Sequence, residues 1–151
     1  MKNTFKKIRD IRIDNDLSQK DMAKILNISR RSYCYYESGR NLFSIKLIVK
    51  FANYFKVNID YLFGLANKQN IESNYEYDNT IAAIRLLNIR KQLNLSQEKF
   101  GKILNLNQRT YASYENNERT INILILLNIA KKFNYSLDYL IGRNNQKSKR
   151  G

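Results

Sequence analysis

The 151-residue chain contains no histidine and only one cysteine, and these absences narrow its chemistry. Without histidine the chain builds no His-based proton relay, no Cys–His nucleophile and none of the usual zinc sites. Cys34 alone forms no internal disulfide, as is typical of proteins in a reducing cytosol. We therefore expect a protein that is not an enzyme and that uses neither a metal nor a cofactor.

Proline is absent and glycine occurs five times, which argues against an all-β fold rich in tight turns. No apolar run approaches the roughly 18 residues that a membrane-spanning helix needs. The first residues also lack the apolar core and small-residue cleavage site of a signal peptide. These features predict a soluble, cytoplasmic protein that does not insert into a membrane.

Acidic residues are scarce, since 27 Lys and Arg stand against 13 Asp and Glu and give a formal net charge of +14. Such a charge indicates a polyanionic partner, either nucleic acid or an anionic membrane surface. The apolar content of 43% excludes a wholly disordered chain. The length fits one ordinary domain or two small ones.

The chain repeats itself at an offset of 78 residues: residues 8–64 align without a gap with residues 86–142, and 20 of 57 positions are identical. Residues 4–66 and residues 81–143 each carry a net charge of +6. The last residues are either a solvated basic end or an additional phosphate contact. We expect two domains (4–66 and 81–143), a polar linker (67–80) and a basic tail (144–151).

The apolar spacing in both copies is helical, and every predicted helix begins at a residue that can cap it. We therefore predict an all-α protein with two tandem bundles of five short helices. The expected helices are 4–14, 18–26, 29–37, 44–55 and 58–63, followed by 80–92, 96–104, 107–115, 122–133 and 136–141.

Only a few residues join the second and third predicted helices of each copy. Asn27 and Asn105 in these connections tolerate the left-handed conformation that a tight helix end requires. Such an arrangement is a helix-turn-helix, although the turn alone is a weak signal. The longer strings are more specific: NDLSQKDMAKILNISRRSYCYYESGR (15–40) and LNLSQEKFGKILNLNQRTYASYENNER (93–119). Both resemble the lambda-repressor-like (Cro/cI, XRE) helix-turn-helix family of DNA-binding transcription regulators.

The third helix of each copy carries the expected contacts to DNA bases. Tyr33 and Tyr36 are three residues apart and share a face, which we assign to the core, as we do Tyr111 and Tyr114. The opposite face is either a reader of DNA or a solvated helix surface. Arginine can bind guanine, and glutamine adenine, through paired hydrogen bonds. The resemblance implies base contacts from Arg30, Arg31, Tyr35, Gln108, Arg109 and Ser113.

Other positions are assigned through the resemblance to phosphate contacts and ion pairs. The family uses the glutamine that opens the second helix as a phosphate clamp, where free N–H groups also favour an anion. The loop after the third helix departs from the family pattern in both copies, and Glu118 in the second would repel phosphate. The implied phosphate contacts are Gln19, Arg40, Asn41, Gln97 and Arg119. The implied structural ion pairs are Arg12 with Glu37 and Arg90 with Glu115.

Two functions from different classes are compatible with these residues. The first is a sequence-specific, double-stranded-DNA-binding transcription regulator of the repressor type, in which two modules act as an intramolecular pseudo-dimer. A 14-residue linker spans at most about 47 Å, enough for recognition helices about 34–36 Å apart. The alternative is an antitoxin-like or anti-regulator module that binds a protein partner, which would need apolar anchors on the third helix. No small-molecule effector is evident, and a protein partner or further self-association stays open.

Overall fold

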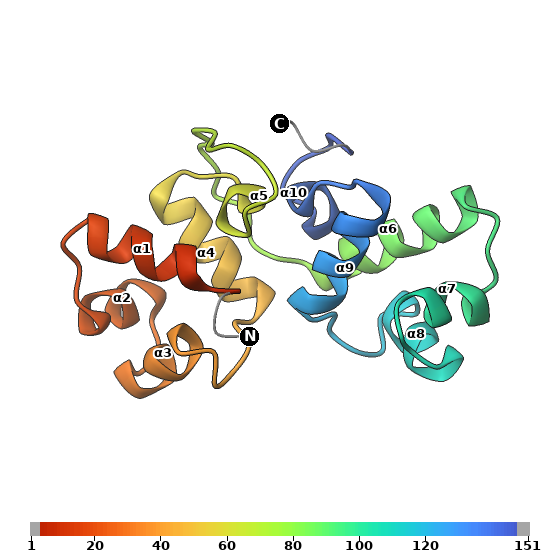
Figure 1. The fold of residues 1–151 in the computed structure, drawn as a ribbon, viewed down its shortest axis with the longest axis horizontal. Coiled ribbons are helices and arrows are strands. Elements are labelled where there is room, and N and C mark those ends of the chain that lie inside the picture. The colour runs from red at the N-terminus through yellow and green to blue at the C-terminus, as the bar shows by residue number, and fades with distance from the viewer. Residues whose placement is uncertain (1–3, 148–151) are drawn as a thin grey trace. The chain divides into compact units, whose positions relative to one another are not determined.

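The computed structural model describes residues 4–147, which form two compact helical units (Figure 1). The first unit ends at Glu76 and the second begins at Tyr77. The described residues contain ten helices and no strand, so the predicted all-α class with two bundles of five helices is confirmed. Between residues 4 and 147, every helix is too short or too polar to cross a lipid bilayer.

Three helices of the first unit begin at the serines that the sequence predicts as caps, whereas the first helix follows Phe5, whose side chain makes no capping hydrogen bond. The side chains of Ser18, Ser29 and Ser44 each accept a hydrogen bond from a backbone N–H three residues further on. Ser18 and Asp21 form a reciprocal capping box. The helices are α1 (Lys6–Asp14), α2 (Gln19–Leu26), α3 (Arg30–Glu37), α4 (Ile45–Phe55) and α5 (Ile59–Leu62).

The second unit repeats this order with different capping residues. Ser96, Asn107, Asn122 and Ser136 accept the corresponding backbone hydrogen bonds. Asp78 caps the first helix of this unit by accepting from the Thr80 N–H. The helices are α6 (Asn79–Gln92), α7 (Gln97–Ile103), α8 (Gln108–Glu115), α9 (Ile123–Phe133) and α10 (Leu137–Ile141).

Each unit has its own apolar core, to which every long helix contributes. In the first unit the rings of Phe5 and Phe43 meet edge to face at 5.0 Å. In the second, Phe100 and Tyr111 meet in the same way at 5.2 Å. Aliphatic side chains fill the remaining space and are almost completely buried: Ile8, Met22, Leu26 and Ile48 in the first unit, and Leu86, Ile89, Leu126 and Ile129 in the second.

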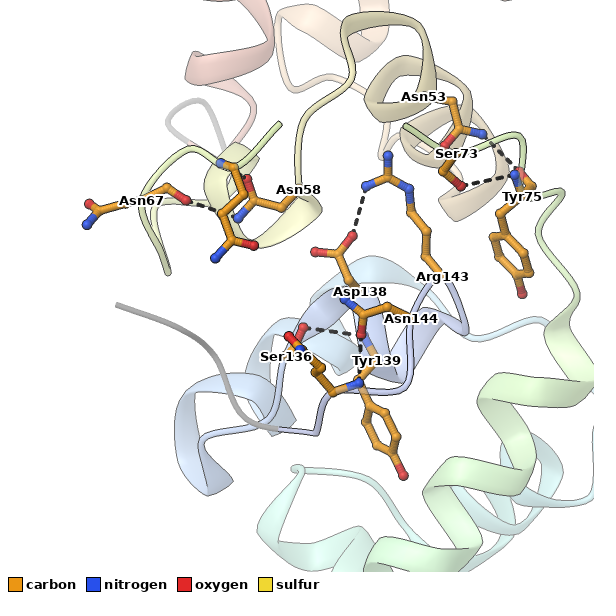
Figure 2. Close-up of polar contacts among 12 residues, drawn as sticks. Asn53, Asn58, Asn67, Ser73, Tyr75, Ser136, Asp138, Tyr139, Arg143 and Asn144 are labelled. Carbon is orange, nitrogen blue, oxygen red and sulfur yellow. Dashed lines mark hydrogen bonds and ion pairs between the residues drawn. The ribbon is translucent and has the colours of Figure 1, made fainter. Parts of the chain in front are cut away.

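Residues 67–76, expected to belong to a linker, instead hydrogen-bond back to the first unit; we call them the return segment. Asn58 directly precedes α5, but its side chain donates to the Asn67 carbonyl (3.1 Å) and accepts from the Gln69 N–H (2.8 Å) rather than capping the helix. Asn53 donates to the Tyr75 carbonyl at 2.9 Å (Figure 2). The segment predicted as a linker (67–80) is therefore not free. Its residues 67–76 bond to the first unit, and its last two residues, Asn79 and Thr80, belong to α6.

Polar contacts also fix the chain after α10, where the sequence predicts a basic tail. Arg143 and Asp138 form an ion pair of 2.9 Å whose two side chains are almost fully buried (Figure 2). Arg85 stacks on the Tyr139 ring at 4.1 Å and donates to the Asn144 carbonyl at 2.8 Å. Residues 144–147 thus return to the second unit, while residues 148–151 of the predicted tail lie outside the described residues.

The return segment predicts a difference between two fragments of the first unit. We propose the domain boundary between Glu76 and Tyr77, so fragment 1–76 should fold alone. Fragment 1–66 lacks the return segment and should lose about 1–3 kcal/mol of unfolding free energy, because several hydrogen bonds of modest net value are missing. Urea denaturation followed by circular dichroism measures both. Equal stability of the two fragments would show that the return segment contributes nothing.

Candidate nucleic-acid interface

The helix-turn-helix of each unit is held by short-range backbone contacts. The predicted left-handed residues are confirmed, with φ of 57° at Asn27 and 59° at Asn105. After each turn the chain bonds back to the preceding helix, from the Ile28 N–H to the Ala23 carbonyl at 2.9 Å and from the Leu106 N–H to the Gly101 carbonyl at 2.8 Å. These bonds fix the angle at which α3 leaves α2 and α8 leaves α7.

Buried tyrosines determine which face of α3 and α8 points outward. Tyr33 and Tyr111 are completely buried, and Tyr114 is 9% exposed, as the assignment of this face to the core predicts. Tyr36 is half-buried and stacks on Phe43 at 4.9 Å. Because this face packs into the core, the first two residues of each recognition helix are exposed to solvent.

The structure brings the predicted ion pairs together with paired hydrogen bonds. Arg12 contacts the two carboxylate oxygens of Glu37 at 2.9 and 2.8 Å. Arg90 contacts Glu115 in the same way at 2.8 and 2.7 Å. Each arginine also donates from Nη1 to a backbone carbonyl in the turn before the next helix, that of Leu17 in the first unit. One guanidinium thus joins the first helix, the following turn and the recognition helix.

Both carboxylates are held in their ionised form. Burial alone would raise the pKa of Glu37, but hydrogen bonds from Arg12 and Gln19 and the nearby Tyr33 hydroxyl together lower it below its usual value. The pKa of Glu115 is lowered for the same reasons. Burial and the neighbouring carboxylate raise the pKa of Tyr33, whose hydroxyl makes no hydrogen bond of standard geometry.

The two glutamines predicted to clamp phosphate lie at the starts of α2 and α7. Each donates from Nε2 to the carboxylate of the ion pair at 3.3 Å, Gln19 to Glu37 and Gln97 to Glu115. In the first unit the half-buried Cys34 thiol also donates to Gln19 Oε1 at 2.9 Å. The carboxylate of the ion pair therefore orients the glutamine side chain in each unit.

On α3, the predicted base-contacting residues are exposed or half-exposed. Arg30 and Arg31 are exposed, and Tyr35 is partly exposed one turn further on. Arg31 Nε donates to the Tyr35 hydroxyl at 3.0 Å. The predicted phosphate contact Arg40 places its guanidinium over the Tyr35 ring at 4.7 Å. The structure thus brings together three residues that the sequence assigned to separate contacts.

On α8, two of the three predicted base contacts reach the surface. Gln108 and Arg109 are exposed. Ser113 is only 9% exposed, and its hydroxyl donates to the Thr110 carbonyl at 2.6 Å. Its own carbonyl accepts from the N–H groups of the following loop, which covers this part of the helix. The structure does not bring Ser113 to the exposed face.

The loops that follow the recognition helices carry the remaining predicted phosphate contacts. Arg40, Asn41 and Arg119 are exposed. Each loop turns through a left-handed residue, Gly39 at φ 79° and Asn117 at φ 59°, and asparagine is among the non-glycine residues that best tolerate this conformation. The replacement of glycine by asparagine in the second copy therefore preserves the turn.

The sequence did not indicate what holds the second loop in place. Asn79, at the start of α6, donates to the Arg119 carbonyl at 3.3 Å and accepts from the Ile121 N–H at 3.1 Å. Asn117 also donates to Thr80 at 3.1 Å. These contacts join residues about 40 positions apart, so no local pattern reveals them. They attach the Arg119 loop to α6.

In each unit a short, tight turn joins two helices, and the second helix exposes polar residues at its N-terminal end; this arrangement is typical of helix-turn-helix proteins. The helix-turn-helix family model matches twice, at residues 8–62 and 86–140. The chain therefore belongs to the helix-turn-helix family of the lambda-repressor-like (Cro/cI, XRE) type.

The chain is also similar to parts of two known proteins. The chain is 32% identical over 53 residues to the cryptic phage CTXphi transcriptional repressor RstR of Vibrio cholerae, a match that covers 35% of this chain and 48% of that protein. A crystal structure of a transcriptional regulator from Listeria innocua is 24% identical with a TM-score of 0.40, covering 67% of this chain and 85% of that one. The first match spans about half the length of the curated relative.

Removal of one ion-pair partner should destabilise its own unit. We expect Arg12→Ala to lower the unfolding free energy of the first unit by about 3 kcal/mol, because Glu37 keeps a largely buried charge without its partner. Arg9→Ala, an exposed change on the same helix, should stay within about 0.5 kcal/mol. Amide hydrogen exchange resolves the two units. An Arg12→Ala effect no larger than that of Arg9→Ala would contradict a stabilising role for the pair.

The lowered pKa values predict an acid-dependent loss of stability. Glu37 and Glu115 bind protons more readily unfolded than folded, so their contribution is complete above the ordinary pKa of about 4.5 and is lost as pH falls through the lower folded values. Thermal unfolding between pH 7 and pH 2.5 measures the loss. Because Asp21 also has a lowered pKa, from its hydrogen bonds with Ser18, Glu37→Gln is the control. The variant should show a weaker pH dependence than the wild type.

Proposed function

We propose that this protein is a sequence-specific, double-stranded-DNA-binding transcription regulator of the repressor type. Membership of the helix-turn-helix family supports DNA as the partner, as does the net charge of +14. The similarity to a named phage transcriptional repressor supports the direction of regulation. Binding rather than catalysis is the proposed activity.

The observation that carries this proposal is an exposed arginine at the same position of both recognition helices. Arg31 and Arg109 each occupy the second position of their helix, and both are exposed. The N-terminal residues of a recognition helix are those that reach base edges in the major groove. Arginine there can donate two hydrogen bonds to O6 and N7 of guanine.

The remaining residues divide between base reading and phosphate contact. Arg30, Tyr35 and Gln108 would lie near the bases beside these two arginines. Gln19, Gln97, Arg40, Asn41 and Arg119 would contact the backbone, which positions a protein without reading sequence. We do not propose Ser113 as a base contact, because this residue is buried and its hydroxyl donates within its own helix.

We further propose that the two units act as an intramolecular pseudo-dimer on two half-sites. Helix-turn-helix dimers place recognition helices about 34–36 Å apart, one helical turn of DNA. Two units in one chain supply both helices, and the covalent connection raises the effective concentration of the second after the first has bound. Because Arg30 corresponds to Gln108, the half-sites should differ and the operator should be an imperfect palindrome.

Selection of bound duplexes from a random library tests this function. The full chain should recover two half-sites, and Arg31→Ala and Arg109→Ala should each relax preference at one base pair, in different half-sites, by about 1–3 kcal/mol. Lys50→Ala, an exposed change on α4, serves as the control and should leave the motif unchanged.

Three outcomes would contradict parts of the proposal. A uniform loss of affinity in both arginine variants, with the motif unchanged, would show that α3 and α8 do not read the bases. A single half-site would exclude the pseudo-dimer. Absence of duplex binding even at about 50 mM salt, where phosphate contacts are strong, would favour the protein-partner alternative.

A further inference from the structure

The first unit carries a cluster of three side chains that has no equivalent in the second. Two arginines lie close to the Tyr35 ring: the guanidinium of Arg31 is 5.5 Å and that of Arg40 is 4.7 Å from the ring centroid. The Tyr35 hydroxyl also accepts the hydrogen bond from Arg31 Nε at 3.0 Å. We call Arg31, Tyr35 and Arg40 the arginine–tyrosine–arginine cluster.

Local backbone geometry assembles this cluster. Arg31 and Tyr35 are four residues apart on α3, so their side chains lie on one face of the helix. Left-handed Gly39 then reverses the chain, and the Asn41 N–H donates to the Tyr35 carbonyl at 3.1 Å. This bond holds the loop against α3 and keeps Arg40 beside the ring.

The contacts orient Arg31 without using its terminal nitrogens. Nε donates to Tyr35, whereas Nη1 and Nη2 make no hydrogen bond or ion pair among residues 4–147. These two nitrogens are the donors that a fork-shaped contact with guanine can use. A free arginine side chain loses considerable rotamer freedom when it binds. Tyr35 restricts that freedom before DNA arrives.

The second unit supplies an internal comparison. Arg109 corresponds to Arg31, but Ser113 replaces Tyr35 and Glu118 replaces Arg40. Ser113 is buried, and Arg109 has no hydrogen-bonding or stacking partner within the described part of the chain. The exchange of Arg40 for Glu118 also reverses the charge at the third position. Arg31 is thus oriented by a neighbouring side chain, whereas the corresponding Arg109 has no such partner among the described residues.

We propose that Tyr35 is a positioning residue that couples base reading by Arg31 to phosphate contact by Arg40, so that the first unit supplies the larger share of base discrimination. This inference rests on the proposed DNA-binding function. Its mechanism is preorganisation: the arginine pays less of its ordering entropy on binding, and the phosphate contact and the base contact form together.

A mutant cycle in the full-length chain tests the coupling. Arg31→Ala should relax preference for one base pair by about 5- to 150-fold. Tyr35→Phe removes only the hydroxyl and should relax preference at the same base pair by about 3- to 10-fold. The double variant should be no less specific than Arg31→Ala alone, because Tyr35 acts through Arg31.

The aromatic ring is tested separately from its hydroxyl. Tyr35→Phe keeps the surface on which Arg40 stacks and should keep the wild-type salt dependence of affinity. Tyr35→Ala should reduce that dependence toward the value of Arg40→Ala, since each lost phosphate contact lowers the salt slope by about 0.9. In the second unit, Ser113→Ala is the matched control and should leave preference at the Arg109 base pair unchanged.

Failure of the inference is distinguishable from failure of the proposed function. If the wild type selects no DNA motif, the function itself is wrong and the inference falls with it. If the wild type selects a motif that Arg31→Ala relaxes, but Tyr35→Phe matches the wild type, Tyr35 does not position Arg31. If Tyr35→Phe relaxes a different base pair, and its effect multiplies with that of Arg31→Ala, Tyr35 reads its own base. Circular dichroism of each variant confirms that the fold is retained.

Discussion

The ion pair between Arg12 and Glu37, repeated as Arg90 and Glu115, is the interaction on which the rest of each unit depends. Its guanidinium touches the first helix, the turn after it and the last residue of the recognition helix at once. Its carboxylate also binds the glutamine that opens α2 or α7. Burial makes a charge without a partner costly, so these four segments are stable only in one arrangement.

Around this shared frame, the two copies have diverged at the surface. The frame residues are identical, whereas residues on and just after the recognition helix differ: Arg30 corresponds to Gln108, Tyr35 to Ser113 and Arg40 to Glu118. Substitution of exposed side chains costs little stability, so this face can change while the frame stays the same. At these positions the first copy has aromatic and cationic contacts, whereas the second has a buried serine and a loop in which Glu118 stands beside Arg119.

The two units also use different contacts to hold the chain that follows their last helix. Lys7 stacks on Tyr61 at 4.3 Å in the first, and Arg85 stacks on Tyr139 at 4.1 Å in the second. The guanidinium of Arg85 has more N–H donors than a lysine ammonium, and they point in fixed directions. It donates to the Asn144 carbonyl and so holds the chain that follows α10. In the first unit, Asn58 and the return segment fulfil this role through side-chain amide hydrogen bonds.

The sequence by itself determined the repeat, the helix order, most of the capping residues and the helix-turn-helix, because caps, left-handed asparagines and apolar periodicity are local signals. It also placed the tyrosines of the buried face by their spacing. Only the tertiary structure decided the return of residues 67–76, the attachment of the Arg119 loop to Asn79, the burial of Ser113 and the stacking of Arg40 on Tyr35. These features depend on side chains that meet through turns or across long stretches of chain, and residue spacing carries no information about such contacts.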